Sequence, residues 1–277
     1  MKYKHDKITP TADLISYFRT FSDTPCTQEI AEMTNAEKTA KDILKEAFPE
    51  SMFLAAMSES RYKRIDLRAR KYRNILEVAV GRSPRDLIFT EDRNVQYVAT
   101  DLPDSLLQHK VVIQELMRRH KLKRPNLHFM AANALCLKDL RAAADLLPQG
   151  ELAIISEGFM VYLPKEEKII FLKNVYELLK DRGGCLITSD VIFIRKDDGR
   201  SSALHEKISD RSGRDMRDNG FVDAEDAERF FRENRFSSET YLDKVDVVSI
   251  KNLHLEDNPG CRRVINYPVW VLKPIIG

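Results

Sequence analysis

The chain has 277 residues, enough for one large α/β domain with a sizeable apolar core. Its 45 basic and 43 acidic residues leave a net charge of +2, so composition gives no argument for binding nucleic acid or an anionic membrane surface. No run of about 18 apolar residues occurs, and the start MKYKHDKITP lacks the apolar core of a secretion signal, so the sequence predicts a soluble, cytoplasmic protein.

Cysteine and histidine spacing indicates no metal site. Cys26, Cys136, Cys185 and Cys261 lie far apart and form no C-x-x-C pair, so neither a zinc knuckle nor a disulfide framework is indicated. His5, His109, His120 and His128 also lack metal-ligand spacing. We therefore expect buried free thiols and no bound metal.

The amino-terminal part of the chain predicts helices. Residues 8–73 carry apolar side chains at helical spacing, interrupted at Pro49, and predict a helical cap of residues 1–73 over the cofactor face. The segment RYKRIDLRARKYR, which starts at Arg61, holds seven basic residues and the single acid Asp66. Such a segment is typical of a solvated helix face, and it also suits one or two arginines that grip a carboxylate. Both interpretations stay open.

Strand and helix patterns alternate regularly from residue 74 onward, which predicts a mostly parallel sheet with helices on both faces. The predicted strands are 74–80, 96–100, 126–131, 152–156 and 185–194, and the predicted helices are 84–90, 102–120, 138–147, 165–180 and 224–234. Two further apolar segments, 240–250 and 263–272, are expected to pair as an antiparallel hairpin at the sheet edge.

A long polar stretch, residues 195–219, follows the last of these parallel strands. It exceeds an ordinary connection and predicts a lid or substrate loop inside a cofactor-binding domain of residues 74–277, which forms one compact unit with the cap. Its acids and bases are mixed, so its charge does not distinguish anionic from cationic substrates.

The turn after the first predicted strand combines an acid with small residues. Glu77 interrupts the apolar strand, and an ionised carboxylate buried there needs a partner, for which a ligand is one candidate. Ala79, Gly81 and Ser83 are small enough for the backbone to approach a ligand, and Asp101 ends the next strand, where open α/β sheets bind ligands. A dinucleotide fingerprint needs more glycines, and Ser83 as a helix N-cap would occupy donors that a phosphate requires. The pattern favours a phosphate-free nucleoside cofactor such as S-adenosylmethionine, although a plain tight turn looks similar.

Four segments in order carry a family resemblance: ILEVAVGRSPRDL, YVATDLP, NLHFMAANAL and AIISEGFMVYL. Together they resemble the leucine carboxyl methyltransferase-like family of class I S-adenosylmethionine-dependent methyltransferases, and most closely its bacterial branch of polyketide-type O-methyltransferases. ITPTADLISYFRTFSDTP and RYKRID resemble the same branch, so the likeness extends to about Val191. The resemblance implies an α/β, Rossmann-like, seven-stranded, mostly parallel sheet with one antiparallel edge strand. It also implies methyl transfer to a carboxylate or hydroxyl oxygen of a small molecule or peptide, with S-adenosylhomocysteine as product.

The resemblance also assigns cofactor-binding residues. Ala79, Gly81 and Ser83 would lie against the methionine part, with Glu77 supporting the turn from beneath. Asp101 would bind the ribose hydroxyls. The remaining implied cofactor residues are Leu102 on the adenine ring, Asn133 and Ala134 at the adenine edge, Glu157 and Gly158 near the methionyl ammonium, and Arg61 on the carboxylate. Many relatives carry Asp at the position of Asn133, so its side-chain carbonyl is the expected contact, and Arg64 is so near to Arg61 that the register stays open.

The acceptor end is less defined. Met160 and Tyr162 would shape it, and Tyr162 and His205 are the candidate catalytic residues. A carboxylate acceptor needs no general base at neutral pH, whereas an alcohol or phenol does. His205, Asp190 and His254 are the candidates for that base, although His205 also suits a plain surface position and Asp190 a cap of the strand end.

Other function classes match less well. A short-chain oxidoreductase would need Tyr-x-x-x-Lys, but the fourth residue after Tyr162 is Glu166 and Lys165 comes one position early. Ser156-Glu157-Gly158-Phe159 is not the Asn/Asp-Pro-Pro-aromatic loop of a nucleic-acid base methyltransferase. A regulatory protein that binds the cofactor without transferring a methyl group stays open as the alternative, and the sequence does not indicate the oligomeric state.

Overall fold

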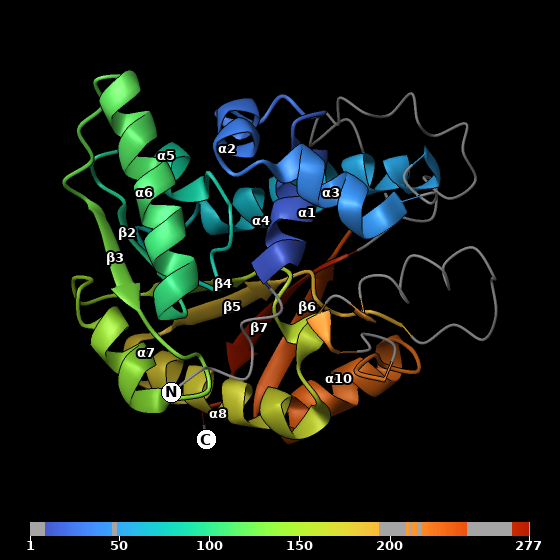
Figure 1. The fold of residues 1–277 in the computed structure, drawn as a ribbon. Helices are drawn as coiled ribbons and strands as arrows, with labels where there is room; N and C mark the ends of the chain where they lie inside the picture. The colour runs from blue at the N-terminus through green and yellow to red at the C-terminus, as the bar shows by residue number, and fades with distance from the viewer. Residues whose placement is uncertain are drawn as a thin grey trace.

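The chain folds into a seven-stranded sheet between two layers of helices, as the computed structural model shows (Figure 1). The structure describes residues 9–45, 49–193, 209–210, 212–214, 218–242 and 268–276. The elements before the sheet are α1 (Thr9–Arg19), α2 (Thr27–Met33), α3 (Ala36–Leu44), η2 (Pro49–Met52) and α4 (Phe53–Ala69). The next are β1 (Asn74–Val78), α5 (Arg85–Phe89), β2 (Gln96–Asp101), α6 (Pro103–Arg119), β3 (Leu127–Ala131), α7 (Leu137–Ala144) and β4 (Leu152–Ser156). The last are η3 (Met160–Tyr162), α8 (Lys165–Arg182), β5 (Gly184–Thr188), α10 (Ala224–Glu233), β6 (Phe236–Tyr241) and β7 (Val269–Pro274).

The sheet has the strand order β3-β2-β1-β4-β5-β7-β6. Neighbouring strands from β3 to β5 pair in parallel, and β7 pairs antiparallel with both β5 and β6. This confirms the predicted Rossmann-like sheet of mostly parallel strands. The order reverses between β1 and β4, so a topological switch point, where such sheets bind ligands, lies at the carboxyl ends of these two strands.

The predicted terminal hairpin is present as the antiparallel pair β6 and β7. Its strands differ in position from the predicted segments, because β6 begins at Phe236 and β7 ends at Pro274. Residues 243–267, which contain most of the predicted first strand, lie outside the described residues. β7 also pairs with β5, so the antiparallel strand stands one place in from the edge that β6 forms.

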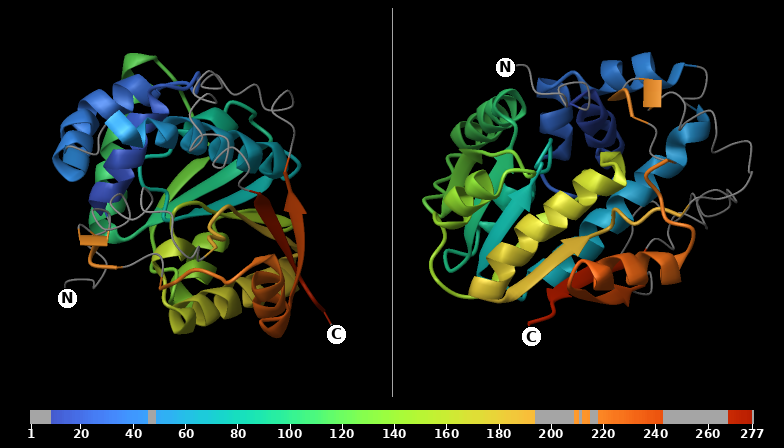
Figure 2. Two further views of the ribbon diagram at one scale, coloured as in Figure 1. Left: turned by 90° about the vertical axis from the view of Figure 1, so that its right-hand side faces the viewer. Right: turned by 90° about the horizontal axis from the view of Figure 1, so that it is seen from below.

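Alternate side chains of the strands point into two separate apolar layers. Leu76 and Val78 pack with α7, α8 and α10 on one face, and Ile75 packs with α5 and α6 on the other. Figures 1 and 2 show these two helix layers on opposite faces of the sheet. Because β1 and β4 are buried along their whole length, any charged side chain at their ends must find its partner inside the protein.

The helices before β1 contribute to a third apolar cluster. In it, Phe18 of α1, Leu44 of α3 and Leu54 of α4 join Val161 of η3, the loop that follows β4. These parts of α1, α3 and α4 therefore lie at the carboxyl end of the sheet, whereas Ile65 and Ala69 of α4 pack against a face of the sheet. Within the described part of the chain, no helix combines the length and the apolar character needed to cross a bilayer.

The predicted fifth strand, 185–194, is too long, because β5 ends at Thr188. The hydroxyl of Thr188 accepts the N–H of Asp190 (3.0 Å), and both carboxylate oxygens of Asp190 then accept N–H groups of the loop after β4. Apolar composition continues to Ile194, but the polar pair at 189–190 turns the chain toward that loop. Of the predicted lid, 195–219, only residues 209–210, 212–214 and 218–219 are described.

A buried lysine on α8 gives a test of this layer. Lys168 is 3% exposed, its ammonium donates to the carbonyl of Asn219 and lies 5.0 Å from the ring centre of Phe221, and burial lowers its pKa to about 8. An unfolded lysine titrates near pH 10.4. Between about pH 8 and 10 the unfolded chain binds more protons than the folded one, so the stability contributed by this site rises with pH.

We expect the free energy of unfolding of the wild-type protein to increase relative to that of Lys168→Met between about pH 7 and pH 9.5, measured by urea denaturation. Lys173→Met, on the exposed side of the same helix, is the control and should track the wild-type protein at both pH values. A constant difference between wild-type and Lys168→Met stabilities would contradict the expectation.

Candidate functional site

The turn from β1 to α5 is held in place by the end of β2. Val80 N–H donates to the carbonyl of Thr100 (2.9 Å), and Gly81 N–H donates to Asp101 Oδ2 (3.0 Å). Both Ala79 and Gly81 have left-handed backbones, with φ of 55° and 57°. A Cβ on Gly81 would lie 3.2 Å from Cβ of Ala12 in α1, so the cap touches this turn directly.

Asp101 stands where the sequence places it, at the end of β2. Its Oδ1 accepts the N–H of Leu102 (2.8 Å), while Oδ2 accepts Gly81. Burial raises the pKa of Asp101, and the two N–H groups oppose that shift. Each carboxylate oxygen has a second lone pair. The carboxylate is thus held rigidly by the turn and keeps acceptor positions for further donors.

Glu77 has its partners inside the protein. One oxygen accepts from the Arg85 guanidinium and the other accepts the Tyr97 hydroxyl at 2.6 Å, and the residue is only 2% exposed. The need for a partner that the sequence implies is therefore met by Arg85 at the start of α5, below the turn. Ser83 assists by accepting the N–H of Arg85 on its hydroxyl (3.2 Å), so α5 begins at Arg85, one residue later than expected.

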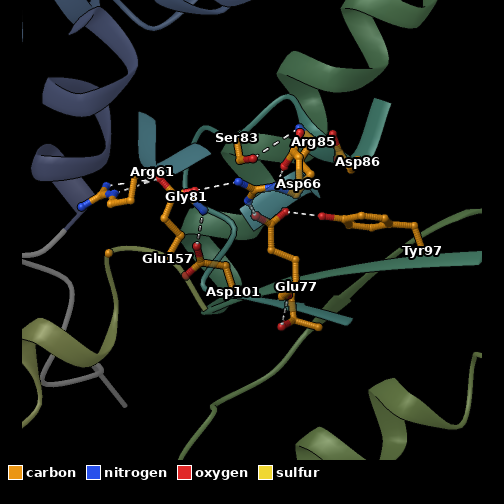
Figure 3. Close-up of polar contacts among 12 residues, drawn as sticks. Arg61, Asp66, Glu77, Gly81, Ser83, Arg85, Asp86, Tyr97, Asp101 and Glu157 are labelled. Atoms are coloured by element: carbon orange, nitrogen blue, oxygen red, sulfur yellow. Dashed lines mark hydrogen bonds and ion pairs between the residues drawn. The ribbon is translucent and has the colours of Figure 1, made fainter. Parts of the chain in front are cut away.

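Glu157, directly after β4, contacts three arginines, of which Figure 3 labels Arg61 and Arg85. Its Oε1 accepts from Arg19 of α1 at 2.8 Å and from Arg61 of α4 at 3.2 Å. Its Oε2 accepts from Arg85 at 2.7 Å. Burial raises the pKa of Glu157, but the charges of Arg19, Arg85 and Arg61 outweigh it and hold the pKa well below its usual range.

Two buried donors, on Arg19 and on the Tyr62 ring that packs against Arg19 and Arg85, lack a hydrogen-bond partner among the described residues. They are Nε of Arg19 and the hydroxyl of Tyr62. Arg19 lies over the Tyr62 ring at 5.1 Å, so the two groups are neighbours. Buried donors without partners carry a desolvation cost, and in native proteins they mark places where a water or ligand belongs.

The predicted adenine-edge residues follow β3. The side-chain oxygen of Asn133 accepts the N–H of Leu135 (3.0 Å), and the N–H of Asn133 donates to Asp139 (3.0 Å). The carbonyl of the buried residue Ala134 accepts from Asn174 (3.1 Å). The segment is therefore fixed by its own hydrogen bonds at the same edge of the sheet as Asp101.

The predicted acceptor-side residues are engaged in the loop after β4. Asp190 accepts the N–H groups of Gly158, Phe159 and Met160 at 2.7–2.9 Å, which anchors this loop. Tyr162 is buried against the cap, its hydroxyl shares a hydrogen bond with Thr11, and burial raises its pKa. His205 and His254, the other two candidates, lie outside the described residues.

Sequence patterns missed several residues of this site. Arg19, Tyr62, Asp66, Arg85 and Tyr97 surround the acids Glu77 and Glu157, and none of them was singled out. Arg85 had a usable signal, because it opens the helix that follows the strand with the buried acid Glu77. Arg19 and Tyr62 had no such signal. Arg19 pairs with Glu157, 138 residues away in sequence, and Tyr62 contacts Arg85 only by stacking in the folded protein.

No protein-family model matches the chain, and no curated protein does. Among solved structures it is similar to a pericyclic reaction enzyme, with 12% identity, a TM-score of 0.46, and coverage of 72% of this chain and 42% of that one. It is also similar to an O-methyltransferase family protein from Burkholderia thailandensis (13%, TM-score 0.48, covering 88% and 61%). A third is magnesium protoporphyrin IX methyltransferase from Synechocystis PCC 6803 with bound SAH (12%, 0.46, 80% and 86%). The chain spans less than two thirds of the length of the first two, and the assignments below rest on its own residues.

The left-handed Ala79 gives a test of the turn. A non-glycine residue at such φ costs roughly 1–2 kcal/mol, and a glycine there avoids that cost. We expect Ala79→Gly to raise the free energy of unfolding by about 1 kcal/mol in urea denaturation. The control Ala99→Gly, in the middle of β2, should lower it, since glycine in a strand interior is unfavourable. A loss of stability in Ala79→Gly would contradict a strained turn.

Proposed function

We propose that the protein is an S-adenosylmethionine-dependent O-methyltransferase of the leucine carboxyl methyltransferase-like type. The observation that carries the proposal is the set of ion pairs at Glu157, with two unpartnered donors beside it. This set lies at the end of β4, next to the switch point, and Asp101 ends β2 on the far side of the same turn.

The charges at Glu157 suit a zwitterion. Arg19 and Arg61 approach Oε1 from the cap helices, and these side chains are 7% and 13% exposed. Arg85 holds Oε2 and is fully buried. An amino-acid group would exchange partners without changing the net charge, because its carboxylate replaces Oε1 on the two arginines while its ammonium takes Oε1.

The unpartnered donors fit the same group. Among the residues that the structure describes, none accepts from Arg19 Nε or from the Tyr62 hydroxyl, and a carboxylate is an acceptor with four lone-pair positions. A methionyl carboxylate would satisfy donors that the protein leaves unsatisfied. The orphaned atoms therefore support an anionic end at this place, and Glu157 supports a cationic one.

The nucleoside end is assigned to the neighbouring strands. Asp101 keeps lone pairs for the two ribose hydroxyls, Leu102 would cover the adenine ring, and Asn133 with Ala134 would line its edge. Ala79, Gly81, Ser83 and Gly158 form the backbone between the two ends. No phosphate-binding glycine loop is needed for such a ligand, in agreement with the short turn.

S-adenosylmethionine, when bound, would supply a methyl group from its sulfonium to the acceptor oxygen, and the S–CH3 electron pair would stay on sulfur in the neutral thioether product. The protein's part is to hold both ends of the cofactor and to exclude water, which α1 does by contacting Gly81, Arg82 and Glu157. Asp190 accepts three N–H groups and the Tyr162 hydroxyl shares a hydrogen bond with Thr11, contacts that hold the acceptor side of the proposed site, and we assign the general base to neither. A small molecule or peptide with a carboxylate needs none, and His205 is the proposed base for a hydroxyl acceptor.

Calorimetry with S-adenosylmethionine and S-adenosylhomocysteine tests the proposal, with NADH as the negative control. We expect binding of both sulfur compounds and none of NADH. Absence of binding of either sulfur compound would refute the methyltransferase assignment. Binding without transfer of labelled methyl to a panel of carboxylic and phenolic acceptors would point to the regulatory alternative.

The ribose assignment is tested at Asp101. Asp101→Ala should weaken binding of S-adenosylhomocysteine and of 5′-methylthioadenosine alike, by about 1–3 kcal/mol, because both contain the ribose. Asp101→Asn keeps one acceptor oxygen and should lose less. Unchanged affinity in Asp101→Ala, measured by calorimetry, would contradict the assignment.

The carboxylate assignment is tested at the two cap arginines. Arg19→Met and Arg61→Met should each weaken the binding of S-adenosylhomocysteine by roughly tenfold or more. The affinity for 5′-methylthioadenosine should stay unchanged, because that compound lacks the amino-acid group. Arg70→Met, at the exposed end of the Arg61 helix, is the matched control and should change neither. Equal losses for both ligands would place the amino-acid group elsewhere.

A further inference from the structure

Arg85 occupies an unusual position for an arginine. It is fully buried, and its three guanidinium nitrogens contact three different carboxylates. Nε donates to Asp66 of α4 (2.6 Å), one terminal nitrogen donates to Glu77 of β1, and the other donates to Glu157 (2.7 Å). Figure 3 shows these carboxylates converging on the one side chain.

The surroundings leave this guanidinium no alternative orientation. Its plane lies over the Tyr62 ring at 4.2 Å, and its backbone N–H is held by Ser83. Glu77 is fixed in turn by the Tyr97 hydroxyl at 2.6 Å. A planar fork with each nitrogen occupied cannot rotate without breaking several charged hydrogen bonds at once.

The two oxygens of Glu157 are consequently different. Oε2 is tied to the immobile Arg85, whereas Oε1 faces Arg19 and Arg61, which belong to the cap and retain some exposure. Fixing one oxygen of a carboxylate fixes the direction of the other. Oε1 is therefore held on the side of Arg19, whose Nε has no hydrogen-bond partner among the described residues.

We propose that Arg85 is a positioning residue for the amino-acid end of the cofactor, an inference that rests on the proposed function. It touches no ligand itself. It acts through Glu157, by holding Oε2 so that Oε1 points at the incoming ammonium. Asp66, Glu77 and Tyr97 form the support that holds Arg85, and none of them reaches the ligand.

The alternative is that Arg85 merely stabilises the core, and ligand choice separates the two roles. S-adenosylhomocysteine carries the amino-acid group and 5′-methylthioadenosine does not. A positioning role affects only the first ligand, because Glu157 faces only its ammonium. A purely structural role disturbs the sheet ends and weakens both.

The experiment is calorimetry of both ligands with Arg85→Met and Arg85→Lys. We expect S-adenosylhomocysteine to bind roughly ten- to a hundredfold more weakly to Arg85→Met, with 5′-methylthioadenosine within about twofold of wild type. Arg85→Lys keeps the charge but not the fork, so it should recover part of the loss. Arg118→Met, an exposed arginine of α6 that is paired with Glu115 on the same helix, is the control and should bind both ligands as wild type does.

Two further variants keep the inference testable if Arg85→Met does not fold. Tyr97→Phe preserves the ring and removes only the hydroxyl that holds Glu77, so it should show a smaller loss confined to S-adenosylhomocysteine. Glu157→Gln removes the proposed ammonium acceptor. Adding Arg85→Lys to this variant should therefore cause no further loss of affinity for S-adenosylhomocysteine. Equal losses for both ligands, or additive losses in the double variant, would overturn the positioning role.

The pH profile supplies a second readout. Glu157 faces Arg19 of α1, Arg61 of α4 and Arg85 of α5, with Asp66 and Glu77 behind Arg85, and the three arginines hold its pKa well below the usual range. Wild-type affinity for S-adenosylhomocysteine should therefore stay flat between about pH 5 and pH 8. Without the Arg85 charge the pKa of Glu157 rises, so affinity in Arg85→Met should fall as pH falls through that range.

The outcomes also separate this inference from the proposed function. If the wild-type protein binds neither ligand, the proposed function fails. If it binds both, and the Arg85 and Tyr97 variants lose both equally, the proposed function stands and the positioning role is refuted.

Discussion

A single buried guanidinium ties the site to the sheet. Arg85 joins α4, β1 and the end of β4 by bonding to Asp66, Glu77 and Glu157, and the turn that contains Ala79 and Gly81 runs directly above it. Burying one charge among apolar strands is costly unless all its donors are used. Here each nitrogen has a carboxylate, so the geometry of three elements is set by one planar group.

The same network attaches the cap. Arg19 and Arg61 complete the charge balance at Glu157, so three arginines face three carboxylates, and Arg82 adds a separate ion pair to Asp13 of α1 at 2.9 Å. The amino-terminal helices α1 and α4 therefore contribute residues to the site. The cluster has equal numbers of positive and negative charges, and its pairs of Arg19 and Arg61 with Glu157 can be exchanged for pairs with a ligand. A zwitterionic group, which has no net charge, therefore suits the cluster better than a simple ion.

The turn shows a second constraint, in which conformation is set by neighbours. Ala79 keeps a left-handed backbone although it is not glycine, because its neighbours bond to Thr100 and Asp101. Such strain persists only where surrounding contacts determine the backbone. The turn, Asp101 and the cap helix α1 are thus one rigid unit at the carboxyl edge of the sheet.

The sequence by itself determined the seven-stranded sheet, the helical cap and the acids Asp101 and Glu157 at strand ends, because hydrophobic periodicity and local turn chemistry are encoded within a few residues. It also implied that Glu77 needs a partner. Only the tertiary structure decided which partner, and it brought Arg19 to Glu157 across 138 positions and Tyr62 beneath two guanidinium groups. The structure also shows that β5 ends at Thr188, whereas the apolar composition predicted a strand that continues to residue 194. These pairings depend on which strand ends and helices lie side by side, and no local pattern records that.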